Sequence, residues 1–144
     1  MKAHEKYMTE ALKEAEKARQ KGEVPVGCVV VCNNQIIARA HNLTESLTDP
    51  TAHAEMQAIT ASTSYLGGKY LNQCTLYVTL EPCCMCAGAL YWSQIGTLVY
   101  GAKDEKKGYS LISTKLLHPK TLVINGILMD PSSALLSNFF SNKR

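Results

Sequence analysis

Two short segments of this 144-residue sequence combine residue types that bind metal ions and move protons. The first is His53-Ala54-Glu55, and the second is Pro82-Cys83-Cys84-Met85-Cys86, about thirty residues further along the chain. Imidazole nitrogen and thiolate sulfur are common zinc ligands, and a zinc ion with three protein ligands keeps its fourth position open for catalysis. One histidine with two cysteines therefore indicates a catalytic metal site, because a structural zinc ion is normally closed by four protein ligands.

The spacing of the second segment favours Cys83 and Cys86 as the two thiolate ligands. Positions i and i+3 of a helix lie on the same side, so Cys83 and Cys86 can bind one ion while Cys84 points elsewhere. Both segments are expected at the start of a helix, where the partial positive charge favours thiolate over thiol. The remaining cysteines adjoin apolar strands, so we interpret them as small packing residues: Cys28, Cys32 and Cys74.

Glu55, in the first of the two segments, is an acidic residue whose role needs an explanation. It lies two positions after His53 and therefore does not share its helix face, so we do not expect both to bind the ion. A carboxylate next to a metal site can take a proton from the water bound there and hand it to a substrate nitrogen. Glu55 is therefore the candidate general acid and base. A purely structural zinc site has no use for such a carboxylate, so its presence counts against a site of that kind.

The elements that must position these residues are predicted from hydrophobic periodicity and from turn residues. Apolar residues at helical spacing predict a first helix over 4–21, and β-branched runs predict strands at 24–31 and 36–38. The Asn33-Asn34 pair between these strands suits a tight hairpin turn, because asparagine tolerates a positive φ. The chain thus begins with a helix followed by a hairpin.

The two metal-binding segments belong to the central part of the sequence. We expect helices over 53–65 and 83–92, and strands over 75–79, 97–100 and 121–124. A terminal helix is expected after Asp130-Pro131, with Asp130 as the N-cap and Pro131 at the first helical position. This order predicts a three-layer α/β/α sandwich, in which helices cover both faces of a five-stranded mixed sheet.

Composition excludes several other classes of protein. With 46% hydrophobic and 19% charged residues, the sequence is typical of a globular protein rather than a disordered one. Its length predicts a single domain over residues 1–144. No segment approaches the run of about 18 apolar residues that would cross a membrane, and the charged start does not resemble a signal peptide. We therefore expect a cytoplasmic protein with no membrane partner, in which closely spaced cysteines bind metal rather than form disulfides.

The net charge of +3 is unevenly distributed. Residues 1–102 carry eight Lys and Arg against nine Asp and Glu, a balance of −1, whereas residues 103–144 carry seven against three, a balance of +4. A basic segment of this kind is the part of a protein that is expected to meet a phosphate backbone.

The two segments and their surroundings resemble the zinc-dependent nucleobase deaminases, whose signature is His-x-Glu followed by Pro-Cys-x-x-Cys. The similarity extends to Glu23-Val24-Pro25-Val26-Gly27, to Asp49-Pro50-Thr51 and to the strand before Glu81-Pro82, and it covers nearly the whole chain. These segments are most similar to the bacterial tRNA-specific adenosine deaminases. The resemblance implies a cytidine-deaminase-like fold, one Zn²⁺ per subunit, a homodimer, and hydrolysis of adenosine to inosine at the wobble position of a tRNA anticodon loop.

The resemblance also implies a role for individual residues. His53, Cys83 and Cys86 would hold zinc, with Glu55 as the proton shuttle. A further group would line the substrate pocket, with Asn42 bonded to the extruded base, Val26 packed on its ring, and the backbone of three more residues around it: Ala54, Leu80 and Glu81. Asp104 and Phe140 would lie near the RNA. From the residues alone, Asn42 also suits a turn, Asp104 a solvated loop, and Phe140 the core.

The sequence departs from the family on the side expected to face RNA. The family commonly has Lys-Thr-Gly-Ala and later Asn-His-Arg, where this chain has Lys106-Lys107-Gly108-Tyr109 and His118-Pro119-Lys120-Thr121. A deaminase of free bases or nucleosides (cytosine, guanine or a cytidine derivative) on the same fold is therefore an alternative, and a non-catalytic zinc or RNA-binding module is another. Tyr91 and Trp92 are expected either at a subunit interface or in the core.

Overall fold

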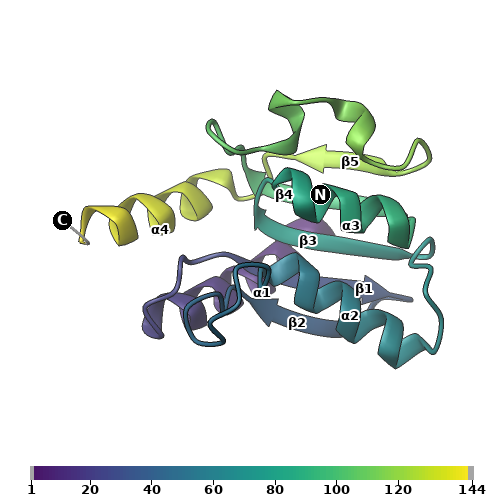
Figure 1. Cartoon of the computed structure of the whole chain (residues 1–144), viewed down its shortest axis with the longest axis horizontal. Coiled ribbons are helices and arrows are strands. Elements are labelled where there is room, and N and C mark those ends of the chain that lie inside the picture. The colour runs from purple at the N-terminus through teal and green to yellow at the C-terminus, as the bar shows by residue number, and fades with distance from the viewer. Residues whose placement is uncertain (1, 143–144) are drawn as a thin grey trace.

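One five-stranded mixed sheet organises the molecule, which we describe from a computed structural model over residues 2–142 (Figure 1). The strands lie in the order β2-β1-β3-β4-β5. Their bounds are β1 Gly27–Cys32, β2 Gln35–His41, β3 Cys74–Leu80, β4 Thr97–Ala102 and β5 Leu122–Asn125. β1 pairs antiparallel with β2 and with β3, whereas β3, β4 and β5 run parallel. The predicted mixed sheet is therefore confirmed.

Helices cover both faces of this sheet, as a three-layer sandwich requires. Figure 1 shows α1 (Lys2–Gln20) behind the sheet and both α2 (Ala54–Leu66) and α3 (Cys84–Ser93) in front of it. Alternate strand residues point to opposite faces, so Val29 packs with Met8 of α1 while Val30 packs with Leu90 of α3. Burial on both faces explains why the central strands are apolar at successive positions.

The hairpin between β1 and β2 forms as its sequence predicts. Asn33 and Asn34 have φ values of 53° and 61°, which are the left-handed values that a tight hairpin turn needs. The first residue of β1 is also constrained, because a Cβ on Gly27 would collide with the backbone of α1 at Ala11 and Glu14. The glycine lets α1 pack directly on the sheet.

The start of the last helix differs from its prediction. α4 spans Met129–Ser141, and its N-cap is Leu128, with a φ of 52°, rather than Asp130. Asp130 and Pro131 lie inside the first turn, where a proline is tolerated because the amides there have no helical acceptor. Tertiary contacts explain the earlier start, since Ile127 is buried in the core and Gly126 N–H bonds to the carbonyl of Gly101 at 3.1 Å.

The arrangement leaves the ends of β3 and β4 next to the helix N-termini of α2 and α3. α4 extends from the sheet past this end of the molecule (Figure 1). Within residues 2–142, no helix combines the length and the apolar character that crossing a bilayer requires.

Candidate active site

The three predicted metal ligands lie together at the N-termini of α2 and α3. His53 is the N-cap of α2 and Cys83 is the N-cap of α3. Their ligand atoms and that of Cys86 all lie within 4.8 Å of one another. The fold thus brings together a histidine and two cysteines that are thirty residues apart in sequence.

The geometry of this group fits a tetrahedral zinc ion. His53 Nδ1 lies 3.6 Å from Cys83 Sγ and 3.5 Å from Cys86 Sγ. Two ligands of one tetrahedral ion, with bonds of about 2.0 Å to nitrogen and about 2.3 Å to sulfur, are separated by about 3.6 Å. The observed separations match this value, so the three residues can hold zinc without rearrangement and leave a fourth position for another ligand.

The electrostatics of the group favour a thiolate at Cys83. Hydrogen bonding from Cys86 lowers the pKa of Cys83 to about 4, with a further contribution from His53. The same contact, together with burial, raises the pKa of Cys86 far above its ordinary value, and contact with Cys83 raises the pKa of His53. These directions favour the thiolate at Cys83 rather than at Cys86, and binding of zinc by both sulfurs would require Cys86 to lose its proton as well.

Glu55 lies in the first turn of α2 and faces the metal-binding group. Its side chain is 4% exposed, and burial raises its pKa to about 7, although the positive charge of His53 opposes this rise. A carboxyl group with a pKa near neutrality can both accept and donate a proton under ordinary conditions. The environment of Glu55 thus suits acid–base chemistry, as the sequence predicts.

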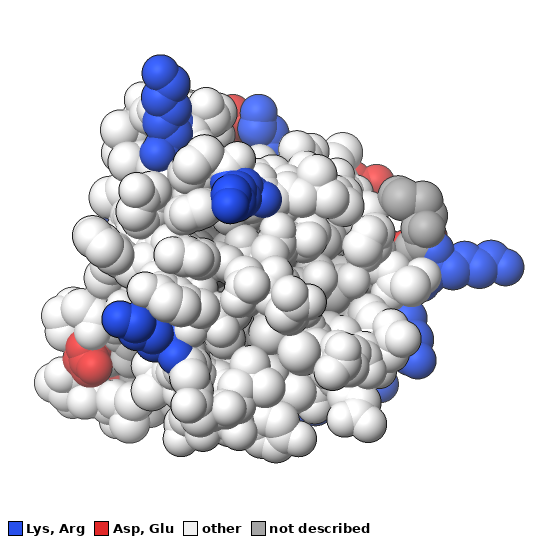
Figure 2. Space-filling view, turned by 90° about the vertical axis from the view of Figure 1, so that its right-hand side faces the viewer, with Lys and Arg blue, Asp and Glu red and all other residues white. Residues whose placement is uncertain are grey.

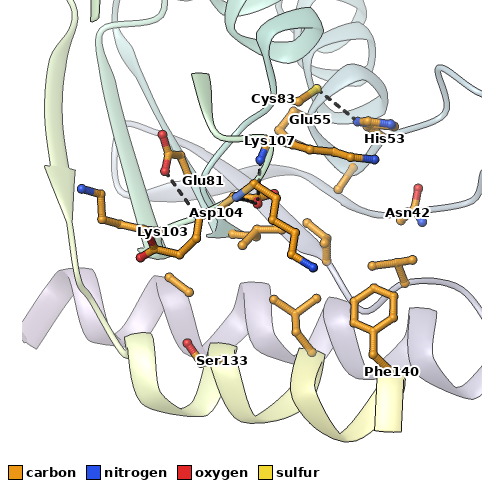
Figure 3. Close-up of a pocket in the computed structure, with 18 of the residues that line it drawn as sticks. Asn42, His53, Glu55, Glu81, Cys83, Lys103, Asp104, Lys107, Ser133 and Phe140 are labelled. Atoms are coloured by element: carbon orange, nitrogen blue, oxygen red, sulfur yellow. Dashed lines mark hydrogen bonds between the residues drawn. The ribbon is translucent and has the colours of Figure 1, made fainter. Parts of the chain in front are cut away.

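A cavity of about 720 Å³ opens onto this group (Figure 3). Its lining includes His53, Glu55 and Cys83, while Cys86 is fully buried. The lining also contains the five residues that the sequence assigns to substrate: Val26, Asn42, Ala54, Leu80 and Glu81. A cavity of this size is within the range of about 300–1,000 Å³ that is typical of small-molecule sites.

Asn42 belongs to the cavity wall rather than to an exposed turn. It directly follows β2, is buried, and its backbone N–H bonds to the carbonyl of Val26 at 3.1 Å. The next residue bonds in turn to Ala52 at 3.0 Å, which places Asn42 beside the segment leading to His53. In Figure 3 the Asn42 amide stands on the same side of the cavity as His53.

The rim of the cavity comes from the segment after β4 and from α4. Asp104 and Phe140 both line it, as do three lysines that the sequence indicates only as part of a charged run: Lys103, Lys106 and Lys107. None of the three lysines forms a salt bridge with another residue in the part of the chain that the structure describes. The charge of Lys107 reaches His53, where it opposes the rise in the imidazole pKa.

The two adjacent phenylalanines of α4 have different surroundings. Phe139 is buried, whereas Phe140 is 53% exposed and lines the cavity. The core interpretation is therefore wrong for Phe140. It is also wrong for Trp92, which is 77% exposed on α3.

The opposite end of the molecule differs from the rim. Figure 2, which views the right-hand side of Figure 1, shows Lys and Arg side chains standing singly among uncharged residues. The lysines of 103–107 thus have no counterpart cluster on that face. Of the four other basic residues of the final segment, Lys115 and Lys120 lie within the described part of the chain, whereas 143 and 144 lie outside it.

The other cysteines stay apart from the metal-binding group. Cys28 and Cys74 are buried, Cys32 is partly buried and Cys84 is exposed. The packing interpretation is confirmed for Cys28 and Cys74. The exposure of Cys84 agrees with its expected direction away from the site.

Two buried glutamates that support the rim are not recognised as such from the sequence. The carboxylate of Glu23 bonds to the segment at Glu45 and Ser46, and that of Glu81 bonds to the segment at Asp104 and Ser110. A fully buried acid with no cationic partner must be satisfied by hydrogen bonds, but only the folded structure shows which donors supply them.

Comparison with known proteins agrees with this site. The family described as the cytidine and deoxycytidylate deaminase zinc-binding region matches residues 1–102, which contain the complete metal-binding group. The chain belongs to this deaminase family. Its cofactor class is therefore zinc, and its chemistry is hydrolytic deamination.

Individual members of the deaminase family resemble the chain over most of its length. A tRNA-specific adenosine deaminase of Bacillus subtilis is 46% identical over 100% of this chain and 92% of its own. A solved structure from a study of A-to-I editing by tRNA deaminases at the wobble position has a TM-score of 0.83 and 39% identity, covering 90% of this chain and 97% of that one. The structure of a guanine deaminase from Bacillus subtilis has a TM-score of 0.68 and 35% identity, over 76% and 73% of the two chains.

Proposed function

We propose that this deaminase hydrolyses adenosine to inosine at the wobble position of a tRNA anticodon. The observation that carries the proposal is the division of one cavity into two parts. Its floor holds the metal-binding group and Glu55, and its rim presents Lys103, Lys106 and Lys107. Two curated relatives that resemble the chain over 97–100% of its length are named tRNA-specific adenosine deaminase.

The residues of the floor divide the reaction between them. His53, Cys83 and Cys86 would hold one Zn²⁺ per subunit, which supplies a Lewis acid that activates water for attack on C6 of the adenine. Glu55 accepts a proton from the attacking water and passes it to the ring nitrogen. It then takes the proton of the new C6 hydroxyl and delivers it to the amino group, which leaves as ammonia when the C6–N bond breaks. Its pKa of about 7, which results mainly from burial, allows both directions of transfer.

The walls of the cavity would hold the extruded base. Asn42 is buried and stands beside His53, so its amide can bond to the edge of the purine while Val26 packs against the ring. The backbone of Ala54, Leu80 and Glu81 would complete the pocket. Extruding a base costs a few kcal/mol of lost stacking, and an anticodon loop reduces that cost because it is already single-stranded.

The rim distinguishes this proposal from the alternative of a free-base deaminase. The similarity to a guanine deaminase shows that the same fold can take a base without RNA. A free base has no phosphate to meet Lys103, Lys106 and Lys107, whereas a phosphodiester backbone is recognised by such ammonium groups. Asp104 and Phe140 stand at the same rim, where they can meet the loop around the reacting nucleotide.

One assay tests the proposed substrate. Zinc-loaded protein is incubated with an anticodon stem-loop that contains a wobble adenosine, and separately with adenosine, guanine, cytosine and cytidine. We expect inosine in the stem-loop and no comparable turnover of the free compounds. Turnover of a free base with no inosine in the RNA would establish the alternative instead.

We also propose that two copies of the chain form a homodimer in the cytoplasm. Trp92 is 77% exposed on α3, and Leu111 and Ile112 are exposed on the one-turn helix η1 (Tyr109–Leu111) and just after it. Where such side chains form one contiguous apolar patch, they commonly mark a protein–protein interface. Sedimentation should show a dimer, and Trp92→Glu should yield a monomer, whereas Tyr70→Ala at an exposed aromatic elsewhere should not. A wild-type monomer would contradict the proposal.

A further inference from the structure

The carboxylate of Glu81 lies beneath the segment that forms the lysine-bearing rim. Glu81 is 2% exposed and follows β3 directly, two residues before Cys83. Its Oε1 accepts a hydrogen bond from Asp104 N–H at 3.1 Å, and its Oε2 accepts from the N–H and the hydroxyl of Ser110 at 3.0 and 2.5 Å. One buried carboxylate therefore joins both ends of residues 104–110.

Backbone contacts close the same segment onto residues 81 and 82. Glu81 N–H bonds to the carbonyl of Ala102 at 2.8 Å, and Tyr109 N–H bonds to that of Pro82 at 2.9 Å. Between these anchors, a Cβ on Gly108 would stand 2.5 Å from Oε1 and 2.6 Å from Oε2 of Glu81. The segment passes so close to the carboxylate that a side chain at position 108 would displace it.

The anchored segment carries Lys106 and Lys107 of the rim, and Lys103 directly precedes it. Asp104 Oδ1 accepts hydrogen bonds from the backbone N–H groups of Lys106 and Lys107, each at 3.0 Å, so it holds the turn that presents them. Asp104 is itself bonded to Glu81 through its N–H. A continuous set of contacts thus leads from the buried carboxylate to the lysines, which line the cavity without a salt bridge among residues 2–142.

Glu23 provides an internal comparison for this arrangement. It is fully buried and accepts hydrogen bonds from Glu45 N–H at 3.0 Å and from both the N–H and the hydroxyl of Ser46 at 2.6 Å. The chemistry resembles that of Glu81, with two amides and one serine hydroxyl on one carboxylate, to which Thr44 adds a further side-chain hydrogen bond. The segment that it holds, residues 43–52, contains no Lys or Arg.

We propose that Glu81 is a positioning residue for recognition of the RNA backbone. Its carboxylate is occupied by three donors, and it acts through the segment 103–110, which it holds so that Lys103, Lys106 and Lys107 meet the phosphodiester groups that flank the reacting nucleotide. This proposal rests on the proposed function, since only an RNA substrate carries those phosphates.

The test compares Glu81→Gln with Glu23→Gln on the anticodon stem-loop. Each variant replaces one acceptor oxygen with an NH₂ group that faces an N–H or O–H donor, so both should lose stability. We expect Glu81→Gln to raise KM on the order of ten-fold, a loss of about 1.4 kcal/mol of binding, with kcat within about two-fold and zinc content unchanged. Glu23→Gln should not change the dependence of KM on salt.

Salt dependence separates lost phosphate contacts from general damage. Each phosphate contact to a single strand contributes about 0.7 to the slope of log affinity against log salt. Glu81→Gln should therefore flatten the plot of log KM against log salt, whereas a purely structural role would leave its slope at the wild-type value. An unchanged slope in a folded, zinc-loaded Glu81→Gln variant would overturn the proposal.

A double-mutant cycle with Lys107→Ala tests whether Glu81 acts through the lysines. In the wild-type background Lys107→Ala should raise KM, and in the Glu81→Gln background it should add little, because the lysine is no longer held in place. Additive effects would contradict the positioning role. Where Glu81→Gln does not fold, Ser110→Ala, which removes one donor, takes its place in both experiments with the same two outcomes.

The outcomes also separate this proposal from the proposed function. If the wild-type protein makes no inosine in the stem-loop, the proposed function has failed. If the wild-type protein is active and the variants of Glu81 and Ser110 retain its KM and salt slope, only the positioning role has failed.

Discussion

The floor and the rim of the cavity are held in place by different kinds of structure. His53, Cys83 and Cys86 belong to the N-termini of two helices that pack on the sheet, so their positions follow from the core. The lysines of 103–107 belong to a segment without regular structure, held by Glu81 and Asp104. The floor is therefore suited to keeping one reaction, whereas substitutions in the rim can change the contacts with substrate without altering that reaction.

This difference predicts that damage to the floor abolishes turnover while damage to the rim weakens substrate binding. The similarity to both a tRNA adenosine deaminase and a guanine deaminase is consistent with such a division. Variants in each part, measured for zinc content, kcat and KM, test whether the two kinds of damage separate in this way.

The largest effect is expected for Glu55→Ala. General acid–base catalysis contributes roughly 10²–10⁴-fold, so turnover should fall by at least that factor when the proton shuttle is removed. Zinc content, measured by atomic absorption, should stay near one per chain, because Glu55 is not among the three grouped ligands. Loss of zinc together with activity would assign Glu55 a structural role instead.

Substitution of a metal ligand should remove zinc and turnover together. Cys86→Ser eliminates a fully buried thiol whose sulfur lies 3.5 Å from His53 Nδ1, so both zinc content and activity should drop. The matched control is Cys84→Ser, because Cys84 lies between the two ligands in sequence but is exposed. Equal zinc loss in the two variants would contradict the assignment of ligands.

A smaller effect is expected at Phe140, on the rim. Stacking of one base on an aromatic side chain is worth about 1–3 kcal/mol, so Phe140→Ala should raise KM for the stem-loop roughly ten-fold and leave kcat nearly unchanged. Phe139→Ala is the control, since that ring is buried and its loss should lower thermal stability instead. If Phe140→Ala lowered kcat and left KM unchanged, the predicted division of roles between floor and rim would be wrong.

The smallest effect is expected at Glu23, which supports the segment that leads to His53. Burial alone would raise the pKa of Glu23, but hydrogen bonds from Ser46 and from the amide of Glu45 outweigh burial and hold the pKa below its usual value of 4.5. A lowered pKa stabilises the fold above about pH 4.5, and that contribution is lost as the pH falls through the folded-state value.

The measurement for Glu23 is the free energy of unfolding between about pH 7 and pH 3, by urea denaturation. Glu23→Gln should destabilise the protein by about 1–3 kcal/mol at neutral pH, the cost of disrupting a buried hydrogen-bonded group. The difference from wild type should shrink as the pH falls, because the wild-type carboxylate becomes protonated. If the difference in the free energy of unfolding did not change with pH, the pKa of Glu23 would be the same in the folded and the unfolded protein, and the prediction would be wrong.

The elements of this fold follow closely from local sequence patterns. The hairpin at Asn33-Asn34 and the strand leading to Glu81 form where turn residues and β-branched runs predict them. The N-cap of α4 is the exception, since burial of Ile127 moves the start of the helix to Leu128 and overrides the local preference for Asp130. Local patterns predict an element well where the core does not compete with them.

The residue types of the floor and their spacing are enough to predict its chemistry, because few residues suffice for a zinc site and its proton shuttle. The rim depends on tertiary contacts instead. The fold separates Phe140 from Phe139, and hydrogen bonds from Asp104 and Ser110 to Glu81, across 23 and 29 positions of sequence, hold the segment that carries Lys106 and Lys107 at the cavity. Such contacts depend on how the chain packs in three dimensions, and no local spacing encodes them.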